Sequence, residues 1–105
     1  MPNLSYIYIG YKDNDRTGSI DFYKASNNNT PPNLIDIELK DGFRKPLNVL
    51  VFTNLAKENI VEHILKRLGD NTGQPALTIT LGATNLAKLT DEEKLIATNK
   101  NYTLV

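Results

Sequence analysis

Residues 75–98 carry, in order, the signals for a strand, a sharp turn and a helix. Leu77, Ile79 and Leu81 alternate with two threonines, which is the period-2 pattern of a strand that buries one face. Gly82 ends this strand, because a residue without a Cβ lets the chain turn sharply. This strand–turn–helix unit therefore has an apolar face that another part of the molecule must cover.

The helix of this unit is marked by a capping box. The Thr90 hydroxyl can accept a hydrogen bond from the third helical N–H, and the Glu93 carboxylate can accept one from the Thr90 N–H. This pair predicts a helix over residues 91–98, and the residues after it, 102–105, are typical of a final strand.

A second unit with the same order lies upstream. The pentapeptide Thr-Asn-Leu-Ala-Lys occurs at residues 53–57 and again at 84–88, and each copy follows an apolar run and precedes a helix. Upstream of the first copy, Ile35, Ile37 and Leu39 alternate as the leucines and isoleucine do before the second. We therefore expect units stacked on one another, with parallel strands on one face, helices on the other and right-handed crossovers.

The helix after the first copy is predicted over residues 58–68. Its apolar residues follow one another at i, i+1, i+4, i+5 and i+8, which places them in one stripe: Ile60, Val61, Ile64, Leu65 and Leu68. Gly69 is expected to end the helix as its C′ residue.

The N-terminal part shows no such unit. Residues 6–11 and 19–23 are rich in aromatic and β-branched residues, which predicts two strands. The connection is too short for a helical crossover, so we expect an antiparallel hairpin. Residues 27–32 are predicted to be a loop, and residues 33–39 a third strand with its isoleucines and leucine on one face.

The middle of the chain is less regular. A turn is expected at residues 41–42, irregular chain at 44–48, and either a short strand or a buried loop at 49–52. We interpret the whole chain as one α/β domain of residues 1–105. Within it, residues 1–32 form a β-hairpin and loop, and residues 33–105 form a short leucine-rich-repeat-like stack of strand–turn–helix units.

Charge and cysteine content exclude several classes of protein. Twelve basic residues balance twelve acidic ones, so no electrostatic field favours nucleic acid or an anionic membrane. No apolar run approaches membrane-spanning length, and the N-terminus has no signal-peptide pattern, so membrane insertion is not expected. The absence of cysteine excludes disulfides, thiolate metal sites and cysteine nucleophiles.

The C-terminal half resembles a known family. Residues 77–104, from Leu-Thr-Ile-Thr-Leu-Gly-Ala-Thr-Asn-Leu-Ala-Lys-Leu to the closing Tyr-Thr-Leu, are similar to the closing repeat of bacterial leucine-rich-repeat surface proteins. Phage tail or baseplate-associated proteins carry the same repeats. Residues 54–73 resemble the preceding repeat, and residues 33–43 do so more weakly. The resemblance implies a non-enzymatic module of a virion or a cell surface.

Two positions depart from this family. The usual spacing places an asparagine where Thr84 stands, and Asn85 comes one residue later, so the pattern does not predict a regular asparagine ladder. Many such proteins also end in Lys-Gly-Trp-Thr-Leu, where this chain has Lys-Asn-Tyr-Thr-Leu at residues 100–104.

One loop resembles a calcium-binding sequence. Residues 13–24 can be set against the EF-hand loop, with candidate ligand or loop positions 1, 3, 5, 6, 8 and 9 at Asp13, Asp15, Thr17, Gly18, Ile20 and Asp21. The twelfth position should be a bidentate Glu but is Lys24, and the flanks are strands. A polar hairpin turn is the preferred interpretation, and calcium binding is the alternative.

Other candidate groups have simpler interpretations. His63 lies away from the apolar stripe, with Asn59 and Arg67 as helical neighbours, so it is expected to be solvated and no triad or zinc site is predicted. Lys40 and the basic pair at residues 44–45 are expected to form a solvated turn.

The aromatic side chains of the N-terminal part form another candidate group: Tyr6, Tyr8, Tyr11, Phe22 and Tyr23. They are expected to form core or cross-strand pairs, or else an exposed platform that binds a partner.

No catalytic, cofactor-binding or metal-binding residue is assigned, and the chain is not expected to be an enzyme. The preferred hypothesis is a structural or adhesion module of a phage tail or bacterial surface protein, which binds a protein partner or surface receptor. The alternative is a free-standing cytoplasmic phage-encoded protein that binds and inhibits a host protein. Self-association into a homo-oligomer is expected in either case, because a short stack exposes the apolar ends of its core.

Overall fold

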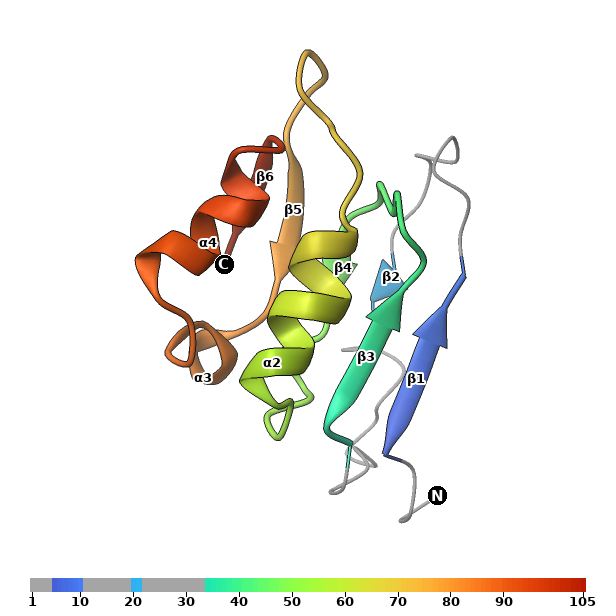
Figure 1. Cartoon of the computed structure of the whole chain (residues 1–105), viewed down its shortest axis with the longest axis vertical. Helices are drawn as coiled ribbons and strands as arrows, with labels where there is room; N and C mark the ends of the chain where they lie inside the picture. The colour runs from blue at the N-terminus through green and yellow to red at the C-terminus, as the bar shows by residue number, and fades with distance from the viewer. Residues whose placement is uncertain (1–4, 11–19, 22–33) are drawn as a thin grey trace.

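The computed structural model describes residues 5–10, 20–21 and 34–105 of the chain (Figure 1). Six strands lie in two sheets, and every strand pair in this part of the chain is parallel. One sheet pairs β1 (Tyr6–Ile9) with β3 (Asp36–Leu39). The other has the order β2 (Ile20–Asp21), β4 (Leu47–Asn48), β5 (Leu77–Thr80) and β6 (Tyr102–Leu104). The molecule is therefore a small mixed α/β domain with parallel strands.

Between neighbouring strands of the four-stranded sheet the chain leaves the sheet and returns in the same direction, and each such passage is called a circuit below. Strand pairs join one circuit to the next. Ile7 lies opposite Ile37 in the first sheet, while Leu47 lies opposite Ile79 and Ile79 opposite Leu104 in the second. Each circuit thus adds one strand to the four-stranded sheet, and the apolar residues of all circuits form one core.

The predicted N-terminal hairpin is wrong. β1 and β2 lie in different sheets, and each is parallel to a strand of the next circuit, β3 and β4. A short connection rules out a helical crossover, but it does not decide which sheet each strand joins. The register of β1 against β3 places Ile9 in the core, and a helix packs beside β3.

That helix, called helix 57–67 below, begins as α2 (Lys57–Asn59) and continues with π-helical hydrogen bonds through η1 (Ile60–Ile64). It closes with the 3₁₀ turn η2 (Leu65–Arg67). Its predicted apolar stripe is confirmed, because all five of its residues are buried.

Gly69 stands at the C′ position after helix 57–67, as expected, but without the left-handed conformation that is common there. Leu68 ends the helix in an extended conformation and pairs with Phe43, and Gly69 is not among the glycines with positive φ. A Cβ on Gly69 would lie 2.7 Å from the Arg44 Cγ and 2.8 Å from the Gly42 oxygen. Gly69 is therefore required by the close approach of two circuits rather than by a left-handed turn.

The segment between the turn at Gly42 and helix 57–67 also differs in detail. The short strand is Leu47–Asn48, inside the stretch expected to be irregular, and buried Val49 and Phe52 follow it as a loop. Ile35 precedes β3 and is 47% exposed, so it does not share the buried face of Ile37.

The C-terminal unit follows the prediction closely. Gly82 turns the chain at a φ of 87°, and α3 (Ala83–Leu86) leads to α4 (Asp91–Thr98). The capping box is present, since the Thr90 N–H donates to the Glu93 Oε1 at 2.8 Å and the Glu93 N–H donates to the Thr90 Oγ1 at 3.2 Å.

The two pentapeptide copies differ in conformation and contact each other. The first forms a turn before α2, and the second overlaps α3. The Lys88 ammonium donates to the Thr53 oxygen at 3.0 Å and to the Leu55 oxygen at 2.7 Å, while the Asn85 Nδ2 donates to the Phe52 oxygen at 2.9 Å and the Leu81 oxygen at 2.8 Å. The repeated sequence is thus the place where one circuit is fastened to the next.

A second set of hydrogen bonds between circuits lies just after helix 57–67 and just after α4. The Asn71 Nδ2 donates to the Asn101 oxygen at 3.2 Å and the Asn101 Nδ2 donates to the Asn71 oxygen at 3.1 Å. The Lys100 ammonium donates to the Leu68 oxygen at 2.8 Å, where helix 57–67 ends. Asparagine amides and lysine ammonium groups therefore satisfy main-chain carbonyls between circuits.

None of the helices in the described ranges has both the length and the apolar character to cross a bilayer.

Candidate binding face

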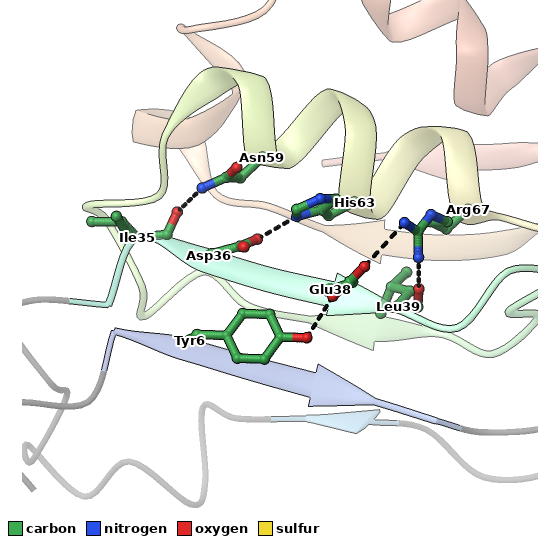
Figure 2. Close-up of polar contacts among 8 residues, drawn as sticks. All are labelled: Tyr6, Ile35, Asp36, Glu38, Leu39, Asn59, His63 and Arg67. Carbon is green, nitrogen blue, oxygen red and sulfur yellow. Dashed lines mark hydrogen bonds and ion pairs between the residues drawn. The ribbon is translucent and has the colours of Figure 1, made fainter.

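A row of polar side chains on helix 57–67 faces β3 (Figure 2). Asn59, His63 and Arg67, called the polar row below, stand at i, i+4 and i+8 and therefore share one face of the helix. The Asn59 Nδ2 donates to the Ile35 oxygen at 2.9 Å, and the Arg67 Nη1 donates to the Leu39 oxygen at 2.9 Å. The polar row thus binds main-chain carbonyls at both ends of β3.

The position of these carbonyls explains why donors are needed there. The Lys40 N–H donates to the Ile9 oxygen, so the main-chain groups of even-numbered residues in and after β3 face β1. The Leu39 carbonyl consequently faces the opposite edge, where helix 57–67 lies. The Ile35 carbonyl, just before β3, points to the same side, where it accepts from the Asn59 side chain and from the Ala56 N–H at 3.0 Å. The helix takes the place of a neighbouring strand, and its side chains supply part of the hydrogen bonding that a strand would supply.

His63 is not simply solvated, contrary to the sequence-based expectation. Its Nδ1 lies 2.7 Å from the Asp36 Oδ1, and both side chains are more than two-thirds covered. The helical neighbours were identified correctly, but the carboxylate comes from a strand 27 residues earlier. A histidine held by a carboxylate can relay protons when a nucleophile or substrate is also in reach. The polar contacts described for His63 contain no hydroxyl or thiol.

Glu38 joins the polar row to β1. The Arg67 Nη2 lies 3.0 Å from the Glu38 Oε2, and the Tyr6 hydroxyl donates to the Glu38 Oε1. The Tyr6 hydrogen bond, with help from Arg67, lowers the pKa of Glu38 below its usual value, and the same hydrogen bond raises the pKa of Tyr6 to about 12. The Tyr6 ring is thereby held in one orientation above β3.

The structure describes two members of the aromatic group, Tyr6 and Tyr8. Tyr6 and Tyr8 stand on one face of β1 and are 45% and 52% exposed, so neither is a core residue. The other three candidates, Tyr11, Phe22 and Tyr23, lie outside the described residues. The exposed pair fits the platform interpretation for these two positions.

The calcium-like loop lies almost entirely outside the described residues, which include only Ile20 and Asp21 of its candidates, in β2. The remaining positions of the loop lie outside the described residues: Asp13, Asp15, Thr17, Gly18 and Lys24. Within the ranges that the structure describes, no group of three or more His, Asp or Glu residues is arranged to hold a metal ion.

The basic cluster is not a solvated turn throughout. Lys45 is buried, with 4% of its surface exposed, and the Arg44 Nη1 donates to the Asp70 oxygen at 2.9 Å. Lys40 is exposed. The cluster therefore contributes to contacts between circuits, and its members do not project together as a basic patch.

Several contacting residues carried no signal that the sequence interpretation used. Asn85 is fully buried, one position after the asparagine site of the family pattern. The alternation of Asp36 and Glu38 with buried residues of β3, together with the polar row at helical spacing, is a pattern that could have predicted a polar strand–helix contact.

These features together form a candidate binding face, which consists of Tyr6 and Tyr8 on β1, Asp36 and Glu38 on β3, and the polar row. Comparisons with protein-family models, with curated proteins and with solved structures find no match to this chain.

Proposed function

We propose that the chain is a non-enzymatic protein-binding module of the structural or adhesion type, built from leucine-rich-repeat-like units in a phage tail or bacterial surface protein. The observation that carries the proposal is the pairing of parallel strands from successive circuits in the four-stranded sheet. A stack of this kind presents regularly spaced side chains on an extended surface, which suits recognition of a macromolecule.

The fastening between circuits supports the same proposal. Asn85 and Lys88, in the second copy of the pentapeptide, donate to main-chain carbonyls in and beside the first copy. Side chains that recur at the same place in the sequence and hold neighbouring circuits together are expected of repeat proteins. The resemblance of residues 77–104 to the closing repeats of surface and tail proteins points the same way.

The chemistry of the candidate binding face favours binding over catalysis. The carboxylates of Asp36 and Glu38 are engaged by His63 and Arg67, and the Tyr6 hydroxyl is engaged by Glu38. A face whose polar groups are already held in place is rigid, and a rigid face with exposed tyrosine rings loses little conformational entropy when a partner binds.

An immunoblot of the native source tests the proposal, with an antibody raised against residues 53–105. We expect a band much larger than 11.8 kDa, enriched in released virions or in the cell envelope. A single band at 11.8 kDa in the cytosol would contradict the proposal and favour the free-standing inhibitor of a host protein.

A binding assay gives an independent test of the face itself. The purified chain is immobilised and exposed to envelope extracts of candidate host cells, with the variant Tyr8→Ser beside the wild type. Tyr8 is half-exposed, so this change leaves the core intact. Equal retention of the same partner by both proteins would place the binding surface elsewhere.

A further inference from the structure

The outer edge of β1 is one of the sheet edges that the described residues leave without a neighbouring strand. β1 is the end strand of its sheet, and no described residue pairs with its other edge. In Figure 1, β1 lies at the margin of the molecule, with β3 on its inner side. Edge strands with unpaired main-chain groups are templates for pairing with another strand.

The hydrogen-bond pattern identifies which main-chain groups face outward. The Lys40 N–H donates to the Ile9 oxygen at 2.8 Å, and the Ile35 N–H donates to the Ser5 oxygen at 3.1 Å. Odd-numbered residues of this strand therefore face β3. The N–H and C=O groups of Tyr6 and Tyr8 consequently point away from the sheet.

The composition of β1 lacks the features that usually prevent edge pairing. Its sequence, Tyr-Ile-Tyr-Ile, has no charged residue and no proline, and all four residues favour strands. Tyr6 and Tyr8 are about half-exposed on one face, and Ile7 is half-buried on the other. An extended segment placed along this edge would gain main-chain hydrogen bonds and would cover aromatic surface.

From this edge we propose that two copies of the chain associate through β1, as antiparallel neighbours about a two-fold axis at Ile7. Tyr6 of each copy then lies opposite Tyr8 of the other, and each such pair exchanges two main-chain hydrogen bonds. The four tyrosine rings then form two neighbouring cross-strand pairs on one face, and aromatic cross-strand pairs stabilise a sheet. The interface is isologous, so it closes with two copies.

Charge supports a second copy as the occupant. The strand itself is uncharged, and the nearest carboxylate, that of Glu38, is paired with Arg67 and with the Tyr6 hydroxyl. In the pair of copies the two Glu38 residues are three strand spacings apart, or about 14 Å. This separation exceeds the screening length of about 8 Å at physiological ionic strength, so identical faces do not repel each other strongly.

The interface is small, and the association is expected to be weak. Pairing of one short strand buries far less than the roughly 1,600 Å² of a standard interface, so we expect a reversible association that depends on protein concentration. Sedimentation equilibrium over a range of protein concentrations should show a reversible change from one copy of 11.8 kDa to two.

Two variants at Tyr8 and one matched control test the location. Tyr8→Pro removes an N–H that points outward and keeps the bonds to β3, and Tyr8→Lys adds a charge at the seam. Each should weaken association at least about tenfold. Leu95→Lys is the matched control. Leu95 is 50% exposed and Tyr8 is 52% exposed, but Leu95 lies on α4, outside the β1 edge. This variant should leave the association unchanged.

Amide hydrogen exchange by NMR gives the residue-level readout. The Tyr6 and Tyr8 amides should exchange quickly in dilute protein and slowly in concentrated protein. Four results would overturn the proposal: a single copy at all concentrations, assembly beyond two copies, loss of association in Leu95→Lys but not at Tyr8, or slow exchange of both amides in dilute protein. Circular dichroism confirms the fold of each variant, and Tyr8→Lys decides the test if Tyr8→Pro does not fold.

Discussion

Asn85 should contribute far more to stability than Asn54, although both occupy the same position of the same pentapeptide. Asn85 is fully buried, and its amide donates to two main-chain carbonyls. Its Oδ1 also accepts from the Lys88 ammonium at 3.0 Å. Asn54 is exposed. Replacing each with alanine therefore changes the same residue in two environments.

The expected cost of Asn85→Ala follows from these contacts. Each neutral hydrogen bond contributes about 1 kcal/mol, and the bond from a charged donor contributes about 1.5 kcal/mol when only half-buried, as Lys88 is. The sum is about 3 to 4 kcal/mol, a large part of the 5 to 15 kcal/mol that stabilises a typical domain. Asn54→Ala should cost less than about 1 kcal/mol, as surface substitutions do.

Urea unfolding followed by far-ultraviolet circular dichroism measures both values, since the chain has no tryptophan to report by fluorescence. With an m-value of about 1.5 kcal/mol per molar urea, Asn85→Ala should lower the midpoint by about 2 M. Equal shifts of the urea midpoint in the two variants would refute the reasoning, because the buried hydrogen bonds of Asn85 would then add nothing to the stability of the fold.

Three further results are expected. In thermal unfolding, Gly82→Ala should destabilise the protein by about 2 kcal/mol or more, because Gly82 has a φ of 87° and an added Cβ would lie 3.0 Å from the Leu50 Cβ. Gly73 has a φ of 83° but open space around it, so Gly73→Ala should destabilise the protein less. Thr90→Ala should lower the unfolding free energy by about 1 kcal/mol, and Thr90→Ser should restore most of it. The main-chain N–H of Thr90 lowers the pKa of Glu93 in the folded protein. The Glu93 carboxylate therefore stabilises the fold fully above its unfolded pKa of about 4.3, and this stabilisation is lost as the pH falls through the lower folded pKa. Glu93→Gln should consequently flatten the fall in melting temperature between pH 6 and pH 3. An unchanged pH profile in Glu93→Gln would contradict this assignment.

The elements that could be predicted are those specified within a few residues. The capping box of α4 needs only Thr90 and Glu93, and β5 needs only the alternation around Ile79. The buried stripe of helix 57–67 needs only helical spacing. Such signals are local, so sequence alone fixes their position to within a residue or two.

The errors concern contacts between residues far apart in the chain. The pairing of β1 with β3 joins residues such as Tyr6 and Asp36, and nothing near either residue selects that partner over β2. The covered state of His63 has the same origin, because its partner Asp36 belongs to a strand that reaches the helix only after folding. Burial of Lys45 likewise depends on how successive circuits pack. Local patterns cannot provide this information.

The polar row reflects a difference between the two sheets in what lies beside their strands. In the four-stranded sheet, β4 and β5 each have strands on both sides, so main-chain groups bind main-chain groups. In the other sheet, among the residues that the structure describes, β3 has a strand on one side only, and helix 57–67 packs beside it. The main-chain donors inside a helix are used by the helix itself, so the Leu39 carbonyl accepts from the Arg67 side chain. The Ile35 carbonyl accepts from the Asn59 side chain and also from the Ala56 N–H, which stands just before the helix. The polar row is therefore first a requirement of the fold, and the binding face that we propose arises because the same side chains also orient Glu38 and, through it, Tyr6.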